Sequence, residues 1–145
     1  MRYVLGIDQG GSKTHVVIAD QEGNLLGMGK SYGACHSSTS LEYAVQAIIQ
    51  AADQAISGCG LLKEDVTAVL GGLTGIDWDY EAELLENEIQ KHFPKAHVKI
   101  VNDCIIAMRA ATRKTAVRNS LRGFRTELCG TEWRELFCIR ILYSR

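Results

Sequence analysis

A polar, glycine-containing turn between two short apolar runs most constrains how this 145-residue chain can fold. The two runs, 3–7 and 14–19, are apolar and rich in β-branched residues, and another apolar run at 25–29 follows a second polar turn. Runs of this length between turn residues are typical of β-strands. The first 29 residues therefore predict a three-stranded antiparallel meander, whose first hairpin turns through residues 8–13.

Helices and strands alternate after this meander. Apolar residues recur at helical spacing over 41–56, behind a T-x-x-E capping box at 39–42, and Gly58 is placed to end that helix. The pattern indicates an α/β fold with a mixed sheet and flanking helices, in which ligand groups gather at the carboxyl ends of the strands. The remaining predicted elements are strands at 66–70 and 98–101, helices at about 80–92 and 104–111, and a glycine-rich loop at 71–75.

Composition limits the class of protein. With 46% apolar and 23% charged residues the chain is typical of a soluble globular protein, and no apolar run approaches the roughly 20 residues of a membrane span. The N-terminus has no small-residue cleavage site, so we expect a cytoplasmic protein without membrane contact. Five cysteines without a C-x-x-C pair favour free thiols over disulfides or zinc, and a net charge of −1 argues against nucleic acid.

The first hairpin turn carries the residues of a phosphate-binding loop. Its glycines allow a tight turn and bring backbone amides close to phosphate oxygens, and its hydroxyl and amino groups add donors and a cation. Asp8, at a strand end, is placed to hold Mg²⁺ through water. A Walker A loop is excluded because the motif is one residue too long and a strand follows, whereas a plain hairpin remains the alternative. The predicted ATP phosphate ligands are Gly10, Gly11, Ser12, Lys13 and Thr14.

Three motifs together resemble one family. LGIDQGGSKTHVVIAD, GGLTGID and VNDCIIAMRA are similar in sequence and order to the BadF/BadG/BcrA/BcrD ATPase family of the actin-like ATPase superfamily, over roughly residues 1–114. Some members of this family are N-acetylglucosamine kinases. The resemblance implies a ribonuclease H-like N-terminal half of a kinase that binds ATP and Mg²⁺ and phosphorylates a sugar hydroxyl. It favours an amino sugar as the small-molecule partner and leaves a homodimer open.

The motif at 101–104 supplies the catalytic candidate. By the resemblance, Asp103 is the base that accepts the proton of the sugar hydroxyl as it attacks the γ-phosphate. Asp103 is equally suited to cap the helix predicted to begin at Cys104. Asn102 either binds a sugar hydroxyl or closes the turn after the strand.

Two loops are candidates for the sugar pocket. The first, 33–36, resembles a sugar-binding loop of G-x-x-N-H type, which makes His36 a candidate ligand and places Cys35 where an amide is expected. A loop histidine is more often simply solvated. In the second loop, Gly75 and Asp77 match the family's other substrate-side loop, although Asp77 also suits a helix N-terminus rich in acidic residues.

The C-terminal part differs in charge from the rest. Residues 113–145 carry 8 Lys+Arg and 3 Asp+Glu, whereas residues 1–112 carry 8 and 14. Codons for residues 126–143, read one base later, permit LNCAVRNGGNYFVYGFYI, which resembles the second phosphate-binding segment of the family. We therefore interpret 1–114 as the N-terminal kinase domain and 115–145 as a frameshift-derived Arg-rich tail in place of a C-terminal domain. The alternative is a genuine basic tail that binds an acidic partner.

Two other functions are also compatible with the sequence. An ATPase activator of a reductase or dehydratase would need a cysteine-ligated iron–sulfur cluster, for which Cys104 is the one cysteine in a suitable place. A non-catalytic module would bind sugar or nucleotide without transfer. Iron content tests the first alternative, and calorimetry with N-acetylglucosamine, with and without ATP, tests the second.

Overall fold

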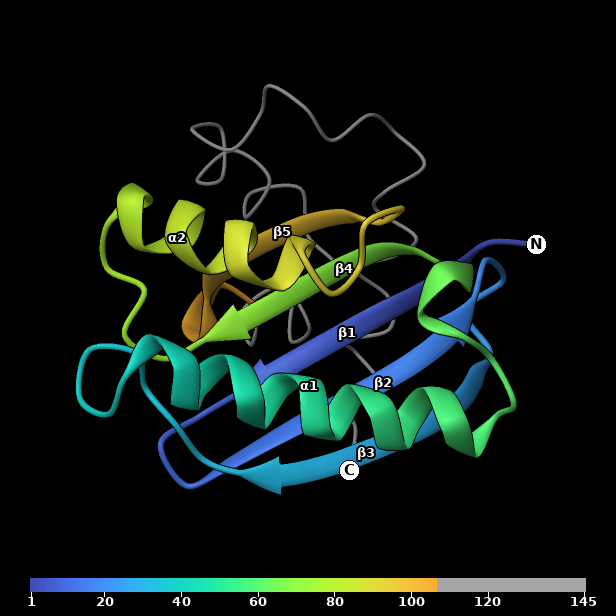
Figure 1. The fold of residues 1–145 in the computed structure, drawn as a ribbon, viewed down its shortest axis with the longest axis horizontal. Helices are drawn as coiled ribbons and strands as arrows, with labels where there is room; N and C mark the ends of the chain where they lie inside the picture. The colour runs from blue at the N-terminus through green and yellow to red at the C-terminus, as the bar shows by residue number, and fades with distance from the viewer. Residues whose placement is uncertain (107–145) are drawn as a thin grey trace.

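The computed structural model describes residues 1–106, which form a five-stranded sheet with helices on one face (Figure 1). The strand order is β3-β2-β1-β4-β5, with antiparallel pairing among the first three strands in sequence and parallel pairing of β4 with β1 and of β5 with β4. This confirms the predicted mixed α/β sheet and its N-terminal meander. The elements are β1 (Tyr3–Gln9), β2 (Lys13–Asp20), β3 (Leu25–Tyr32), α1 (Leu41–Gly58), a 3₁₀ turn (Lys63–Asp65), β4 (Val66–Leu73), α2 (Asp79–Gln90) and β5 (His97–Asn102).

Strand direction brings distant parts of the sequence to one edge of the sheet. β1, β3, β4 and β5 run the same way and end together, and β2 begins where they end, as the arrowheads in Figure 1 show. The segments that follow these strands are 10–12, 33–40, 74–78 and 102–103, and we call them the loop edge. All the residues predicted to bind phosphate or sugar lie in these segments or at the strand ends beside them.

Helices α1 and α2 pack on the same face of the sheet. Because side chains alternate along a strand, Leu5 and Ile7 of β1 point to this face and join Ile48 of α1 and Leu85 of α2 in one core. The strand residues that point to the other face of the sheet, including Val4, form a second and smaller cluster there. Both faces of the central strands are therefore buried, which is typical of an α/β layer fold.

Helix α1 approaches β3 so closely that two positions of the strand have no room for a side chain. A Cβ atom built on Gly27 would lie 2.3 Å from the carbonyl oxygen of Ala55, and one on Gly29 would lie 1.8 Å from the carbonyl oxygen of Ala51. Both distances are far below van der Waals contact, and the obstructing atoms belong to the helix backbone. Glycine at these two positions therefore sets how closely the helix packs on the sheet.

The N-terminus of α1 differs slightly from the predicted capping box. Its N-cap is Ser40, whose hydroxyl accepts a hydrogen bond of 3.1 Å from the backbone amide of Tyr43. The hydroxyl of Thr39 instead donates to the carbonyl of Cys35, at 2.8 Å. The prediction was wrong by one residue because Ser and Thr cap helices in the same way, and the preceding loop here uses the threonine.

The C-terminus of α1 is ended by Gly60 and not by Gly58. Gly60 has φ +73°, and its amide donates to the carbonyl of Ser57, while the amide of Leu61 donates to that of Ile56, both at 3.2 Å. This pair of bonds is the Schellman motif, which requires a left-handed residue one position beyond the C-cap. Gly58 lies within the helix.

Strand β4 is longer than predicted, because Gly71 and Gly72 belong to it and not to the following loop. A Cβ atom on Gly71 would lie 2.6 Å from Cδ1 of Ile100, and one on Gly72 would lie 2.6 Å from Cδ1 of Ile106. Gly71 thus makes room for a side chain of the neighbouring strand β5, and Gly72 for a side chain of the helical segment that follows β5. The loop after β4 is therefore reduced to 74–78.

The last predicted elements are described in part. Residues 103–106 are helical, as expected for the start of the helix predicted at 104–111. The rest of that helix and the tail at 115–145 lie outside the described residues. Within residues 1–106, none of the helices is both long and apolar enough to cross a membrane.

Candidate active site

The turn between β1 and β2 exposes its backbone. The amide of Gly10 donates to the carbonyl of Lys13 at 2.9 Å and closes the turn, while Gly11, Ser12 and Lys13 are exposed. Neither glycine has a positive φ, and a Cβ atom on Gly11 would meet no atom of the described residues within 4 Å. The backbone conformation of this turn is thus open to residues other than glycine. What glycine does at this point is leave the backbone amides open to a close approach.

The loop after β3 supports this turn from behind. The amide of Ala34 donates to the carbonyl of Gly10 at 3.1 Å. A Cβ atom on Gly33 would lie 2.4 Å from backbone atoms of Gly11 and Ser12. The loop 33–40 and the predicted phosphate turn are thus in direct backbone contact.

A buried polar network fixes the strands beneath the turn. Gln9, 1% exposed, donates through Nε2 to the hydroxyl of Thr14 at 3.1 Å and to the carbonyl of Ala44 at 3.0 Å. The Thr14 hydroxyl is buried and donates its single proton to the carbonyl of Tyr32 at 2.8 Å. Thr14 therefore joins β1, β2 and β3, and we no longer expect it to contact phosphate.

Replacing Thr14 by valine is expected to reduce the free energy of unfolding by about 1–3 kcal/mol, because one N–H of the buried Gln9 amide group and the part-buried carbonyl of Tyr32 lose their partner. Urea denaturation of the purified chain measures this loss. Thr14→Ser, which keeps the hydroxyl, is the matched control and should retain more of the stability than the valine variant. Equal stability of the valine variant and the unchanged chain would contradict the role of the network.

Charged side chains occupy the other face of the strands beside the turn. Asp8, His15 and Lys30 are successive cross-strand partners on β1, β2 and β3. Lys13 lies two residues from His15 on β2 and is therefore on the same face of the sheet. Burial, followed by the neighbouring charges of Lys13 and Lys30, lowers the pKa of His15, while Asp8 opposes the shift. The lysines thus create a positive potential next to the exposed amides of the turn. Such a potential attracts phosphate.

A partly buried pair joins the loop 33–40 to the first turn of α2. His36 Nε2 lies 3.2 Å from Oε1 of Glu81, and the two side chains are 9% and 12% exposed. The other carboxylate oxygen of Glu81 accepts hydrogen bonds from the backbone amides of Asp77 at 2.8 Å and Trp78 at 3.0 Å. The pKa of Glu81 is lowered, chiefly by the bond from the amide of Asp77, so the carboxylate is ionised at neutral pH.

Glu81 is a residue that the sequence analysis missed. It occupies the third position of α2, where a glutamate commonly accepts hydrogen bonds from backbone amides at the helix start. That spacing could have revealed it. Asp77 contributes its backbone amide to this cap, and its own side chain is exposed.

Gly75 has φ +79° and lies directly against the first sugar-side loop. A Cβ atom there would be 2.6 Å from Sγ of Cys35, whose thiol also lies 3.2 Å from the hydroxyl of Ser37. Burial alone would raise the pKa of the Cys35 thiol, but hydrogen bonds from Ser37 and Ser38 outweigh it and lower the pKa. The structure therefore brings Cys35, His36 and Gly75 together.

Asn102 and Asp103 lie at the end of β5 on the same edge. Asn102 donates to the carbonyl of Ile76 at 3.0 Å and accepts from the amide of Cys104 at 2.9 Å, so it closes the turn and ties β5 to the loop 74–78. One carboxylate oxygen of Asp103 also accepts from the amide of Cys104, at 2.9 Å. The helix already includes Asp103, so Asn102 and not Asp103 occupies the N-cap position, one residue earlier than predicted. Only β4 separates β1 from β5, which puts their ends about 10 Å apart.

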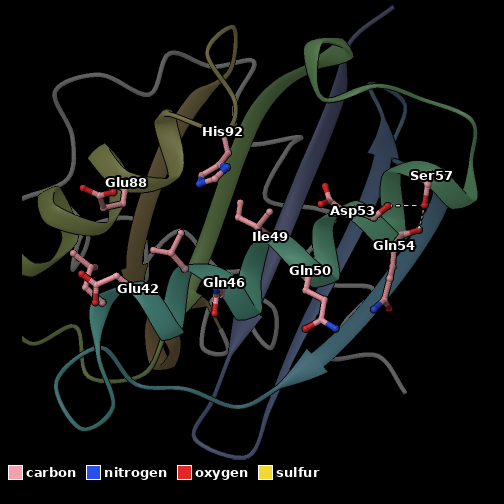
Figure 2. Close-up of a pocket in the computed structure, with 11 residues that line it drawn as sticks. Glu42, Gln46, Ile49, Gln50, Asp53, Gln54, Ser57, Glu88 and His92 are labelled. Atoms are coloured by element: carbon pink, nitrogen blue, oxygen red, sulfur yellow. Dashed lines mark hydrogen bonds between the residues drawn. The ribbon is translucent and has the colours of Figure 1, made fainter.

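A separate cavity of about 840 Å³ lies on the outer side of the helices (Figure 2). Figure 2 shows side chains of α1 on one side and, on the other, Glu88 of α2 and His92 from the turn after it. None of the predicted site residues lines this cavity. Among residues 1–106, no three His, Cys, Asp or Glu side chains are grouped so that they could hold a metal ion. The candidate site is therefore the loop edge.

A family model, described as the BadF/BadG/BcrA/BcrD ATPase family, matches residues 5–119. The chain belongs to this ATPase family. Among curated BadF/BadG/BcrA/BcrD relatives, the N-acetylmuramic acid/N-acetylglucosamine kinase of Clostridium acetobutylicum is 32% identical over 118 residues, which are 79% of this chain and 37% of the relative. The chain thus spans less than two fifths of that kinase.

Solved structures confirm the predicted fold. A protein of Porphyromonas gingivalis described as a candidate N-acetylglucosamine kinase superposes with a TM-score of 0.63 at 23% identity, covering 74% of this chain and 36% of that protein. A candidate N-acetylglucosamine kinase of Chromobacterium violaceum gives 0.61 at 21% identity, with 77% and 38% covered. The BadF/BadG/BcrA/BcrD domain described here therefore has the fold of part of each of these solved structures.

Proposed function

We propose that this chain supplies the phosphate-binding and sugar-binding half of an ATP-dependent kinase that phosphorylates a hydroxyl of an amino sugar such as N-acetylglucosamine. The observation that carries the proposal is the loop edge itself. In a member of this ATPase family, one edge of the sheet presents an exposed glycine turn, two linked substrate-side loops and an aspartate at the end of β5. The kinase that is 32% identical supports the substrate class.

The β1–β2 turn is suited to the phosphates of ATP. The open space at Gly11 allows phosphate oxygens to approach the backbone amides, and Lys13 adds a cation. Asp8 offers hard carboxylate oxygen at the strand end, and Mg²⁺ in kinases is commonly held by one or two carboxylates together with substrate phosphates. The residues present therefore fit a magnesium nucleotide, which supplies the phosphoryl group when bound.

Asp103 is the proposed general base. Its carboxylate accepts the proton of the attacking sugar hydroxyl as the bond from the sugar oxygen to the γ-phosphorus forms. The bond from the γ-phosphorus to the β,γ-bridging oxygen breaks in the same transfer, and ADP leaves. Asn102 holds the adjacent loop through Ile76 and keeps this carboxylate beside the sugar-side loops. His36 and Gly75 shape the pocket for the sugar, with the backbone of Asp77 completing the second loop. We also propose a cytoplasmic location, where ATP is available.

The isolated chain is expected to bind the sugar and Mg-ATP but not to transfer phosphate between them. Calorimetric titration with N-acetylglucosamine, with and without Mg-ATP, should show weak binding, because the loop edge contacts its ligands from one side. No phosphorylated sugar and no ADP should form, since transfer requires the nucleotide to be clamped from both sides. Measurable ATP turnover by the purified chain would show that the loop edge alone supports catalysis and would contradict this expectation. Sugar binding that is indifferent to nucleotide would favour a non-catalytic module.

The proposal of a frameshift after residue 114 gives a second test. Sequencing the coding DNA should reveal a continuation of a hundred or more codons in the shifted frame, and stop codons there would end the proposal. If the frame continues, the restored chain should phosphorylate the sugar, and Asp103→Asn should abolish that transfer. Asp79→Asn, at an exposed aspartate at the start of α2, is the matched control and should leave transfer unchanged.

A further inference from the structure

One ring nitrogen of the partly buried His36 lies against Glu81, and the other has no hydrogen-bond partner among the described residues. The His36 side chain is 9% exposed, its Nε2 lies 3.2 Å from Glu81 Oε1, and its Nδ1 is buried without a hydrogen-bond partner among the described residues. Buried polar atoms in folded proteins are almost always hydrogen-bonded, so an orphaned ring nitrogen requires an explanation. Its position in the first substrate-side loop suggests what it is for.

Glu81 determines which hydrogen-bonding role that free nitrogen has. An ionised carboxylate has no proton to give, so the contact with Nε2 requires Nε2–H as the donor. In a ring that carries one proton, Nδ1 is then an acceptor with its lone pair unused. A group that satisfies Nδ1 must therefore bring its own proton, as a hydroxyl or an amide N–H does and a carboxylate does not.

The carboxylate is also well fixed. Its two oxygens together accept hydrogen bonds from the His36 ring and from the backbone amides of Asp77 and Trp78. The carboxylate therefore cannot rotate without breaking the hydrogen bonds that cap α2. Gly75 lies beside the ring, since a Cβ atom there would come within ordinary van der Waals distance, 3.7 Å, of Cε1 of His36. The ring orientation is therefore set by Glu81 in the first turn of α2, with the loop 74–78 alongside.

We propose that Glu81 is a positioning residue, which holds His36 as the Nε2–H tautomer so that Nδ1 accepts a hydrogen bond from a hydroxyl or amide N–H of the sugar. This inference rests on the proposed sugar site and deepens it. It assigns this part of the pocket to a neutral, proton-donating group of the substrate. A carboxylate-bearing substituent is rejected there, because its lone pairs would face that of Nδ1.

The first experiment reads the tautomer directly in the free chain. A ¹⁵N–¹H correlation spectrum of the histidine rings at pH 8 should show His36 protonated at Nε2. Glu81→Gln should reverse this, because the glutamine oxygen can still cap α2 while its NH₂ group faces the ring and requires Nε2 to accept. Glu83→Gln, at an exposed acid on the same helix, is the matched control and should leave the tautomer unchanged. Protonation at Nδ1 in the unchanged chain would overturn the proposal.

The second experiment adds the ligand to the same sample. On titration with N-acetylglucosamine, the Nδ1 resonance of His36 should move in the upfield direction that marks an accepted hydrogen bond, with Nε2 still protonated. Glu81→Gln should weaken sugar binding about tenfold, the loss of one well-placed hydrogen bond, while Glu83→Gln should not. Equal affinity of the two glutamine variants would overturn the positioning role.

The outcomes separate this inference from the proposed function. If backbone amides in 33–40 and 74–78 respond to the sugar while Nδ1 does not, the sugar site stands and the role of His36 is wrong. If no resonance of the loop edge responds to the sugar, the sugar site itself fails and this inference fails with it. A response of Nδ1 in the absence of sugar, on changing only the buffer, would identify water as its partner and would also overturn the proposal.

Discussion

Gly29→Ala is expected to destabilise the chain by at least about 3 kcal/mol, at the upper end of what overpacking usually costs. The added Cβ would fall 1.8 Å from the carbonyl oxygen of Ala51, so the whole helix α1 must move away from β3. That movement would also strain the hydrogen bond from Gln9 to Ala44 near the start of α1. Urea denaturation followed by circular dichroism measures the loss.

The matched control is Gly58→Ala, in the last turn of the same helix. A Cβ atom there meets no described atom within 4 Å, and alanine is about 0.5–1 kcal/mol better than glycine inside a helix. One Gly→Ala change should thus strongly destabilise the chain and the other should slightly stabilise it. If the two variants have similar unfolding free energies, the close packing of α1 on β3 is not what the glycine provides.

Gly11→Val is expected to weaken the binding of Mg-ATP at least tenfold while leaving the fold intact. A Cβ atom at this position meets no described atom within 4 Å and the residue is exposed, so we expect the midpoint of unfolding to change little. The two methyl groups of the valine would instead occupy the space through which phosphate oxygens reach the turn amides, and we expect at least a tenfold loss of affinity, about 1.4 kcal/mol. Titration followed by backbone amide resonances measures both the affinity and the integrity of the fold.

Two further variants sharpen this result. Gln21→Val, in the exposed turn between β2 and β3, shows whether a valine in a surface turn matters by itself and should bind Mg-ATP normally. Gly33→Ala should impair both fold and binding, because its Cβ would strike the backbone of Gly11 and Ser12 at 2.4 Å. Unchanged Mg-ATP affinity in Gly11→Val would exclude the turn as the phosphate site.

The fold was largely predictable because its strands and helices are encoded by local periodicity. The meander, the helix at 41–56 and the two later strands all follow from the spacing of apolar residues. The glycines were harder to interpret. Gly71 and Gly72 suggested a loop since glycine usually marks one, yet they lie in a central strand where neighbouring side chains need the space. Sequence spacing carries no information about such contacts between elements.

The candidate site was predictable in its location but not in its connections. Motif order placed Asp8, Asp103 and the loops between them at strand ends, and strand direction then brings those ends to one edge. The links that hold the edge together are tertiary and join residues far apart in sequence. The Thr14 hydroxyl looked like a phosphate donor because the sequence does not show that Tyr32 already accepts its proton. Glu81 was overlooked for the same reason, since its partner His36 lies in another loop.

The strand that is made first becomes the centre of the sheet. During synthesis β1 can pair at once with β2, but its other side must wait for β4, which emerges about 60 residues later, after α1 is complete. Until then the nascent chain presents an unpaired edge of apolar residues around Leu5 and Ile7, a template for pairing with another chain. Early docking of α1 onto the meander covers one face of this edge, and the glycine-lined contact with β3 is what permits it. We infer that defects in this contact would appear first as aggregation on the ribosome, before any loss of ligand binding could be measured.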